Sequence, residues 1–117
     1  MQIQTVRGPF DPDQLGRTLM HEHFIFGYPG YNGDHTMAPF DEGIYLRKSN
    51  EIIEAVKKQG FKTIIDVTPN DCGRNPSFLK KVAEANDFHI ICSTGYYYEG
   101  EGASVYFKCL GIIKMRL

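Results

Sequence analysis

The apolar residues of this chain fall into short runs of different period, and Gly and Pro separate the runs. Residues 18–26 form a short apolar run that two histidines and a glutamate interrupt, which indicates a strand. Residues 61–69 and 89–94 are rich in β-branched side chains, as in strands that are buried on both faces. The pattern therefore predicts three strands.

Helical spacing appears between these strands. Residues 45–59 predict one helix, with Gly60 as the residue that ends it. Asn75 and Pro76 predict the start of a second helix, with Asn at the N-cap and Pro in the first turn. The side chains expected to face inward are Leu46, Ile52, Ile53 and Val56 in the first helix, and Phe78, Leu79, Val82 and Ala83 in the second.

Two segments are predicted to lack long regular elements. Residues 1–18 indicate an extended or hairpin lead-in with turns at Gly8-Pro9 and at 11–13. Residues 27–43 are rich in Gly and Pro and predict a long loop, and loops of this length are more often functional than not. The order strand, helix, strand, helix, strand calls for a parallel sheet with right-handed crossovers. The sequence therefore predicts an α/β fold.

Composition narrows the class of protein. A chain of 117 residues fits one domain, and 42% apolar with 23% charged residues is typical of a soluble globular protein. The net charge of -1 argues against nucleic acid or an anionic membrane as a partner. No segment indicates a membrane span or a signal peptide, and Cys72, Cys92 and Cys109 indicate reduced thiols in or near a core. We therefore expect a cytoplasmic protein.

His21 and His23 carry the clearest chemical signal. Residues i and i+2 of a strand point to the same side, so two such imidazoles can converge on one metal ion. The pair comes near the end of a predicted strand and before the long loop, which is the end of a parallel α/β sheet that carries the chemistry. Alone, the His-x-His spacing also fits ordinary surface or core histidines. Its position favours a metal site.

The residues around this pair closely resemble a known family. Residues 5–9 (TVRGP) and 16–23 (GRTLMHEH) match the N-terminal signature of the phosphotriesterase-like branch of the amidohydrolase superfamily. Residues 66–69 (DVTP), 73–76 (GRNP) and 94–98 (TGYYY) match it as well. The resemblance covers residue 5 to about residue 107, and a match this long is highly specific.

The resemblance implies a TIM (β/α)8 barrel, of which residues 1–117 would form the N-terminal part, with three strands and two to three helices. It implies two zinc ions per complete site, although other divalent metals are possible, with His21 and His23 as metal ligands. It implies hydrolysis of a small-molecule lactone, carboxylic ester or phosphotriester by a metal-activated hydroxide, with Tyr97 against the substrate. A homo-oligomer is possible.

The resemblance also places further metal ligands on later strands. A complete barrel takes about 250 residues. A truncated, inactive remnant that binds one metal weakly is therefore the alternative hypothesis.

Other polar residues have less specific interpretations. Asp66 is either a partner of a ligand histidine or a carboxylate that caps a turn. Asp71 and Arg74 are expected to make loop hydrogen bonds or a salt bridge rather than to contact substrate. His35, in the loop, and His89, at the start of the third strand, are not expected to be ligands.

Overall fold

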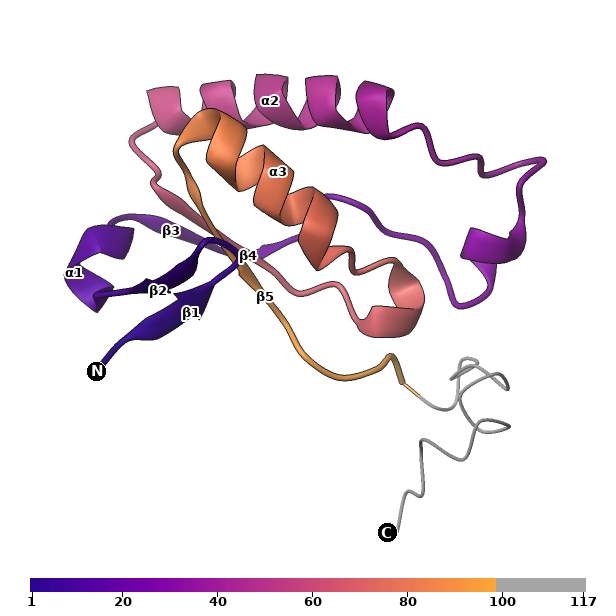
Figure 1. Ribbon diagram of the computed structural model, residues 1–117, viewed down its shortest axis with the longest axis horizontal. Coiled ribbons are helices and arrows are strands. Elements are labelled where there is room, and N and C mark those ends of the chain that lie inside the picture. The colour runs from indigo at the N-terminus through magenta and orange to yellow at the C-terminus, as the bar shows by residue number, and fades with distance from the viewer. Residues whose placement is uncertain (99–117) are drawn as a thin grey trace, which may run out of the picture.

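The structure is a computed structural model that describes residues 1–98. Its larger sheet holds three parallel strands in the order β3 (Thr18–Glu22), β4 (Thr63–Asp66) and β5 (His89–Cys92). Two helices, α2 (Glu42–Lys58) and α3 (Pro76–Asn86), connect the strands and lie on the same side of the sheet (Figure 1). The predicted alternation of parallel strands and helices is therefore confirmed.

Both helices begin at side chains that accept backbone hydrogen bonds. Asp41 precedes α2, and its carboxylate accepts the Ile44 amide at 2.9 Å. Asn75 precedes α3 and accepts the Phe78 amide at 3.0 Å, as the sequence predicted. Because Asp41 supplies the cap, α2 begins before the predicted residue 45. Each cap thus satisfies one of the N-terminal amides that have no acceptor within the helix.

The N-terminal segment forms the predicted hairpin. β1 (Ile3–Thr5) pairs antiparallel with β2 (Gly8–Phe10), and a short helix α1 (Pro12–Leu15) follows. The Val6 amide donates a hydrogen bond of 2.9 Å to the Ile90 carbonyl, which attaches the hairpin to β5.

The core lies between the sheet and the helices. Its buried members are Ile25, Ile53, Ile64, Phe78, Leu79, Val82, Ala83, Phe88 and Ile90. The inward face predicted for the second helix is confirmed, but the prediction is wrong for Ile52 in the first. Ile52 is 54% exposed and lines a groove with Leu19 and Phe24, beside β3. Ile52 directly precedes Ile53 in the helix, so the two side chains point about 100° apart.

The register of the strands separates two ends of the sheet. Glu22 pairs with Asp66, which pairs with Cys92, so these residues mark the carboxyl end. Thr63 and His89 pair at the opposite end, where the hairpin lies. A register irregularity between Leu19 and Glu22 precedes the end of β3. As a result the strand stops at Glu22, four residues before the predicted residue 26.

Two cysteines lie among the described residues, and both are free thiols. Burial raises the pKa of Cys92 to about 11, and burial also raises the pKa of Cys72. Both therefore stay protonated at neutral pH and are poor nucleophiles. Cys109 lies outside the described residues.

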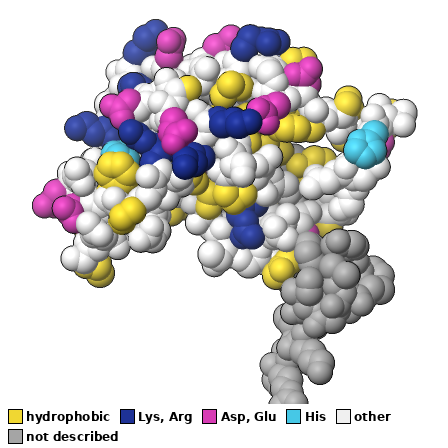
Figure 2. Space-filling view, in the orientation of Figure 1, with side chains coloured by type: hydrophobic (Ala, Val, Ile, Leu, Met, Phe, Trp, Pro, Cys, Tyr) yellow, Lys and Arg dark blue, Asp and Glu magenta, His cyan; other side chains and the backbone are white. Residues whose placement is uncertain are grey.

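The surface of the helices carries charges of both signs. Figure 2 shows Lys and Arg side chains interspersed with Asp and Glu on this face. Within residues 1–98, no helix combines the length and apolar character that crossing a bilayer requires.

Replacing the cap of α3 should cost stability. We expect Asn75→Ala to lower the free energy of unfolding by about 1 kcal/mol, because the Phe78 amide loses its acceptor. Asn75→Asp keeps an acceptor and is the control. Urea unfolding followed by circular dichroism measures both, and equal losses in the two variants would contradict the role of the cap.

The isolated chain should be marginally stable or self-associate. Within the described residues, β3 and β5 are each hydrogen-bonded to one strand of this sheet, namely β4. Exposed strand edges and the apolar groove beside Ile52 favour association. Size-exclusion chromatography with light scattering, together with a thermal melt, measures this. A monomer with a cooperative transition at high temperature would contradict it.

Candidate metal centre

The two histidines lie together at the carboxyl end of β3. His21 is in the strand and His23 follows it directly, and both side chains are exposed. Their ring centroids are 5.4 Å apart, with the ring planes at 73°. Two imidazoles on one tetrahedral zinc ion, with Zn–N bonds of about 2.0–2.1 Å, have centroids about 5.2 Å apart. The spacing of the pair therefore fits joint ligation of one ion.

A threonine from the neighbouring strand contacts the second histidine. Nδ1 of His23 lies 2.9 Å from Oγ1 of Thr68, two residues past the end of β4. Thr68 is fully buried, whereas His23 is exposed. The contact therefore anchors one edge of an otherwise exposed ring.

Asp66 connects the segments that follow β3 and β4. Its Oδ2 accepts the amide of Phe24 at 3.1 Å, and its Oδ1 accepts the amide of Thr68 at 2.8 Å. The carboxylate is 2% exposed. Of the two interpretations left open by the sequence, the structure supports the carboxylate that caps a turn, since the partner of the histidine is Thr68. Sequence reasoning missed Thr68, although it comes two residues after Asp66, the last residue of the strand beside the histidine pair.

The third strand completes this network. The Ser93 amide donates to the Asp66 carbonyl at 2.9 Å, and the Ser93 hydroxyl donates to the Thr68 carbonyl at 2.9 Å. Ser93 therefore donates both of these hydrogen bonds to backbone carbonyls of the segment around Asp66 and Thr68. The ends of all three strands are joined in this way.

Tyr97 is connected to the histidines by a row of aromatic rings. Centroid distances are 5.0 Å from His23 to Phe26, 5.7 Å from Phe26 to Tyr28, and 6.2 Å from Tyr28 to Tyr97. Asp71 accepts the Tyr97 amide at 2.7 Å. Tyr97 thus lies at the far end of an aromatic surface that begins beside the histidine pair.

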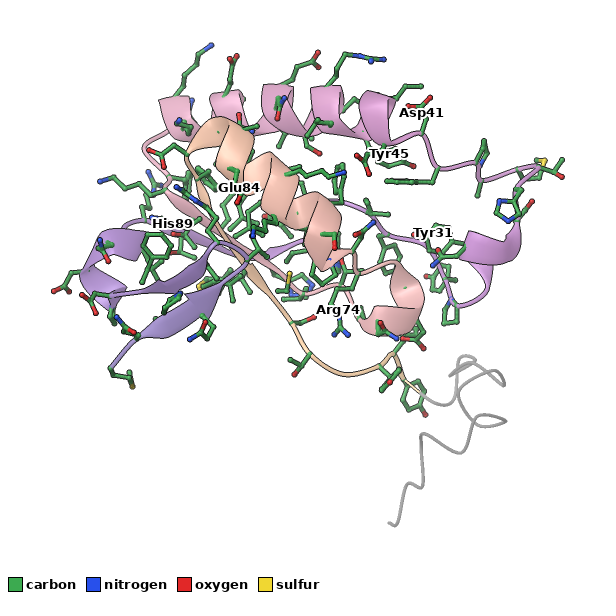
Figure 3. The ribbon with its side chains drawn as sticks, viewed as in Figure 1. Tyr31, Asp41, Tyr45, Arg74, Glu84 and His89 are labelled. Atoms are coloured by element: carbon green, nitrogen blue, oxygen red, sulfur yellow. The ribbon has the colours of Figure 1, made fainter. Side chains whose placement is uncertain are left out.

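The loops next to this surface are held by local contacts. Arg74 donates to the Ser93 carbonyl at 3.0 Å, and Asp71 accepts from Tyr97, so the loop hydrogen bonds expected for both residues are confirmed. The ring of Tyr31 lies against Gly73, where a Cβ would overlap the Tyr31 hydroxyl. Figure 3 labels Tyr31 beside the long loop and Arg74 below the start of α3.

Tyr31 and Arg74 also border a cavity. Its volume is about 320 Å³, and Phe40 and His35 contribute to its lining. Burial is the main cause that raises the pKa of Tyr31 above its usual value.

The other two histidines lie apart from the pair. His35 lies in the long loop and lines the cavity. His89 packs edge-on against Phe10 at the hairpin end of the sheet, with the ring centroids 4.4 Å apart. Burial, followed by the charge of Arg7, lowers the pKa of His89. Across residues 1–98, no group of three or more His, Cys, Asp or Glu could hold a metal ion. Within these described residues, the histidine pair therefore has no third such side chain placed to share an ion with it.

Curated relatives match most of this chain. A phosphotriesterase-related protein of Nematostella vectensis is 33% identical over 82% of this chain and 36% of its own length. The N-acetyltaurine hydrolase of Danio rerio is 32% identical over 84% of this chain and 36% of its own length. The chain therefore spans about a third of the length of these relatives.

Solved structures with the same fold have higher sequence identity to this chain than these curated relatives. An organophosphorus hydrolase from Deinococcus radiodurans is 54% identical, with a TM-score of 0.88 over 96% of this chain and 34% of its own. A mutant of a Deinococcus radiodurans lactonase is 51% identical, with a TM-score of 0.85 over 93% of this chain and 34% of its own. These neighbours are TIM-barrel proteins, so the predicted barrel family is confirmed for the described part of the chain.

The sequence profile of one family extends over nearly the whole chain. It matches residues 1–115, in agreement with the resemblance seen at the histidine pair and after the second strand. The chain therefore belongs to the phosphotriesterase family.

Proposed function

We propose that this chain is the N-terminal part of a metal-dependent hydrolase that acts on small-molecule esters: lactones, carboxylic esters or phosphotriesters. The observation that carries the proposal is the pair of imidazoles whose centroids lie 5.4 Å apart at the carboxyl end of a parallel strand. In barrels of this kind that end carries the active site. Relatives whose names state hydrolase or lactonase activity support the reaction class.

In this proposal His21 and His23 hold one ion of a centre that contains two zinc ions or other divalent metals. A bound divalent metal supplies Lewis acidity and lowers the pKa of water towards about 7. The two histidines would hold such an ion beside the end of the sheet, because one lies in β3 and the other contacts Thr68. The remaining ligands would come from outside residues 1–98, since the described residues hold no third ligand.

Tyr97 is the proposed substrate-binding residue. The aromatic row from His23 through Phe26 and Tyr28 would give an apolar wall beside the metal, suited to the organic part of an ester. A solved form of the Deinococcus radiodurans organophosphorus hydrolase carries the change Y97W, and this chain has tyrosine at the same number. The amide of Tyr97 is fixed by Asp71, which would set where the ring can lie.

A second hypothesis keeps the fold and removes the activity. Within residues 1–98 no third ligand accompanies the pair, which is compatible with an inactive remnant that binds one metal weakly. Both hypotheses share the histidine pair and differ in whether the protein turns substrate over.

We propose a cytoplasmic location and a homo-oligomeric assembly for the protein.

Removing either histidine should weaken metal binding. We expect His21→Ala and His23→Ala each to lower the affinity of the chain for Zn²⁺ or Co²⁺ at least tenfold, because each removes a ligand. His35→Ala, in the loop, is the matched control and should leave the affinity unchanged. Isothermal titration calorimetry measures all three. Equal affinity in the four proteins would refute the metal site.

A hybrid barrel separates the two hypotheses. Residues 1–98 of this chain would replace the corresponding segment of the Deinococcus radiodurans organophosphorus hydrolase, which is 54% identical. We expect the hybrid to hydrolyse a lactone or paraoxon in a metal-dependent manner, because it regains the remaining ligands. His21→Ala in the hybrid should reduce kcat/KM by at least a hundredfold.

The isolated 117-residue chain should not turn over either substrate, since the described part holds only two proposed ligands. A folded, metal-loaded hybrid without activity would favour the remnant. Turnover by the isolated chain that His21→Ala abolishes would show that further ligands are unnecessary.

A further inference from the structure

The contact between His23 and Thr68 involves a particular ring nitrogen. It is Nδ1 that lies 2.9 Å from Oγ1 of Thr68. A neutral imidazole has one nitrogen that carries hydrogen and one that carries a lone pair, and a metal binds the lone pair. Since the hydroxyl occupies the Nδ1 side of the ring, Nε2 is the nitrogen left to face an ion.

The tautomer follows from this geometry. Ligation through Nε2 requires the hydrogen on Nδ1, and Nδ1–H would then donate to Oγ1 of Thr68. A ligand histidine that donates its second N–H to an oxygen is fixed in both tautomer and ring orientation. The hydroxyl of Thr68 can accept such a bond, because an O–H group has lone pairs as well as a hydrogen.

Thr68 is itself fixed at its backbone. Its amide donates to Asp66 at 2.8 Å, and its carbonyl accepts from the Ser93 hydroxyl at 2.9 Å. The same Asp66 carboxylate accepts the amide of Phe24, the residue after His23, at 3.1 Å. One buried carboxylate thus holds the backbone beside the histidine and the backbone of its partner, so the distance between the two side chains is set from both ends.

We infer that Thr68 is a positioning residue, which holds His23 with hydrogen on Nδ1 and presents Nε2 to a divalent metal before the ion binds. This inference rests on the proposed function for the identity of the ligand. The tautomer itself is a property of the metal-free chain. Thr68 acts through His23 and touches neither ion nor substrate.

The test uses the metal-free 117-residue chain labelled with ¹⁵N. A long-range ¹H–¹⁵N correlation spectrum, recorded at a pH where the imidazole is neutral, distinguishes a protonated ring nitrogen from one with a lone pair. We expect hydrogen on Nδ1 of His23 in the wild-type chain and in Thr68→Ser, which keeps the hydroxyl. In Thr68→Val, which removes it, we expect the hydrogen to move to Nε2 in most molecules.

Thr63→Val is the matched control. Thr63 is also fully buried, and its hydroxyl donates to the Leu15 carbonyl at the opposite end of β4. The Thr63→Val variant therefore loses one buried hydrogen bond that does not involve a histidine. The His23 signals of this variant should match those of the wild-type chain. Amide spectra of each variant report whether it is folded. If Thr68→Val unfolds, the tautomer of the wild-type chain still tests the inference, because hydrogen on Nε2 of His23 would overturn it.

Metal affinity gives the second measurement. We expect Thr68→Val to bind Zn²⁺ about 10–100-fold more weakly than the wild-type chain, in the range for a lost partner of a ligand histidine. The Zn²⁺ affinities of Thr68→Ser and Thr63→Val should stay within about threefold of the wild-type affinity, a smaller change than the loss of such a partner produces.

Each outcome has a separate meaning. Hydrogen on Nε2 in the wild-type chain, or an unchanged tautomer in Thr68→Val, would overturn the inference. The expected tautomers in a chain that binds no Zn²⁺ would support the positioning role and contradict the metal site. Zinc bound equally well by Thr68→Val would overturn the positioning role and leave the metal site standing.

Discussion

The buried carboxylate of Asp66 is the constraint on which the candidate site depends. It accepts the amides of Phe24 and Thr68, one from each of the segments that follow β3 and β4. Burying a polar group without hydrogen-bond partners is unfavourable, so these two bonds offset the burial of a side chain that is 2% exposed. They also fix how far the end of β3 lies from the end of β4. The distance between the ends of β3 and β4 therefore determines where the two histidines lie.

The two ends of the sheet carry different sets of side chains. At the carboxyl end, His21, His23 and the aromatic row to Tyr97 form a continuous surface. At the other end, His89 packs against the hairpin, with its Nδ1 buried and unpaired. Histidines at the two ends of the sheet therefore have different surroundings, and parallel strands bring all their carboxyl ends to one edge. The proposed hydrolase chemistry is confined to that edge.

Local sequence patterns predicted most of the fold. The second and third strands, the hairpin and the Asn75 cap follow from short segments, and the structure has all of them. Element boundaries were less accurate, because Asp41 and the register irregularity before Glu22 act where periodicity carries no signal. The spacing of His21 and His23 indicated a possible metal pair, but the contact with Thr68 joins residues 45 positions apart. Only the pairing of β3 with β4 brings them together.

X-ray absorption at the zinc edge reports which atoms surround a bound ion, so it tests whether His21 and His23 are metal ligands. We predict that zinc bound to this chain is surrounded by two imidazole nitrogens at about 2.0–2.1 Å, with the multiple scattering that imidazole rings produce. Replacing both His21 and His23 by Ala should remove that scattering. A spectrum without an imidazole signature, or one that the double variant leaves unchanged, would contradict the account.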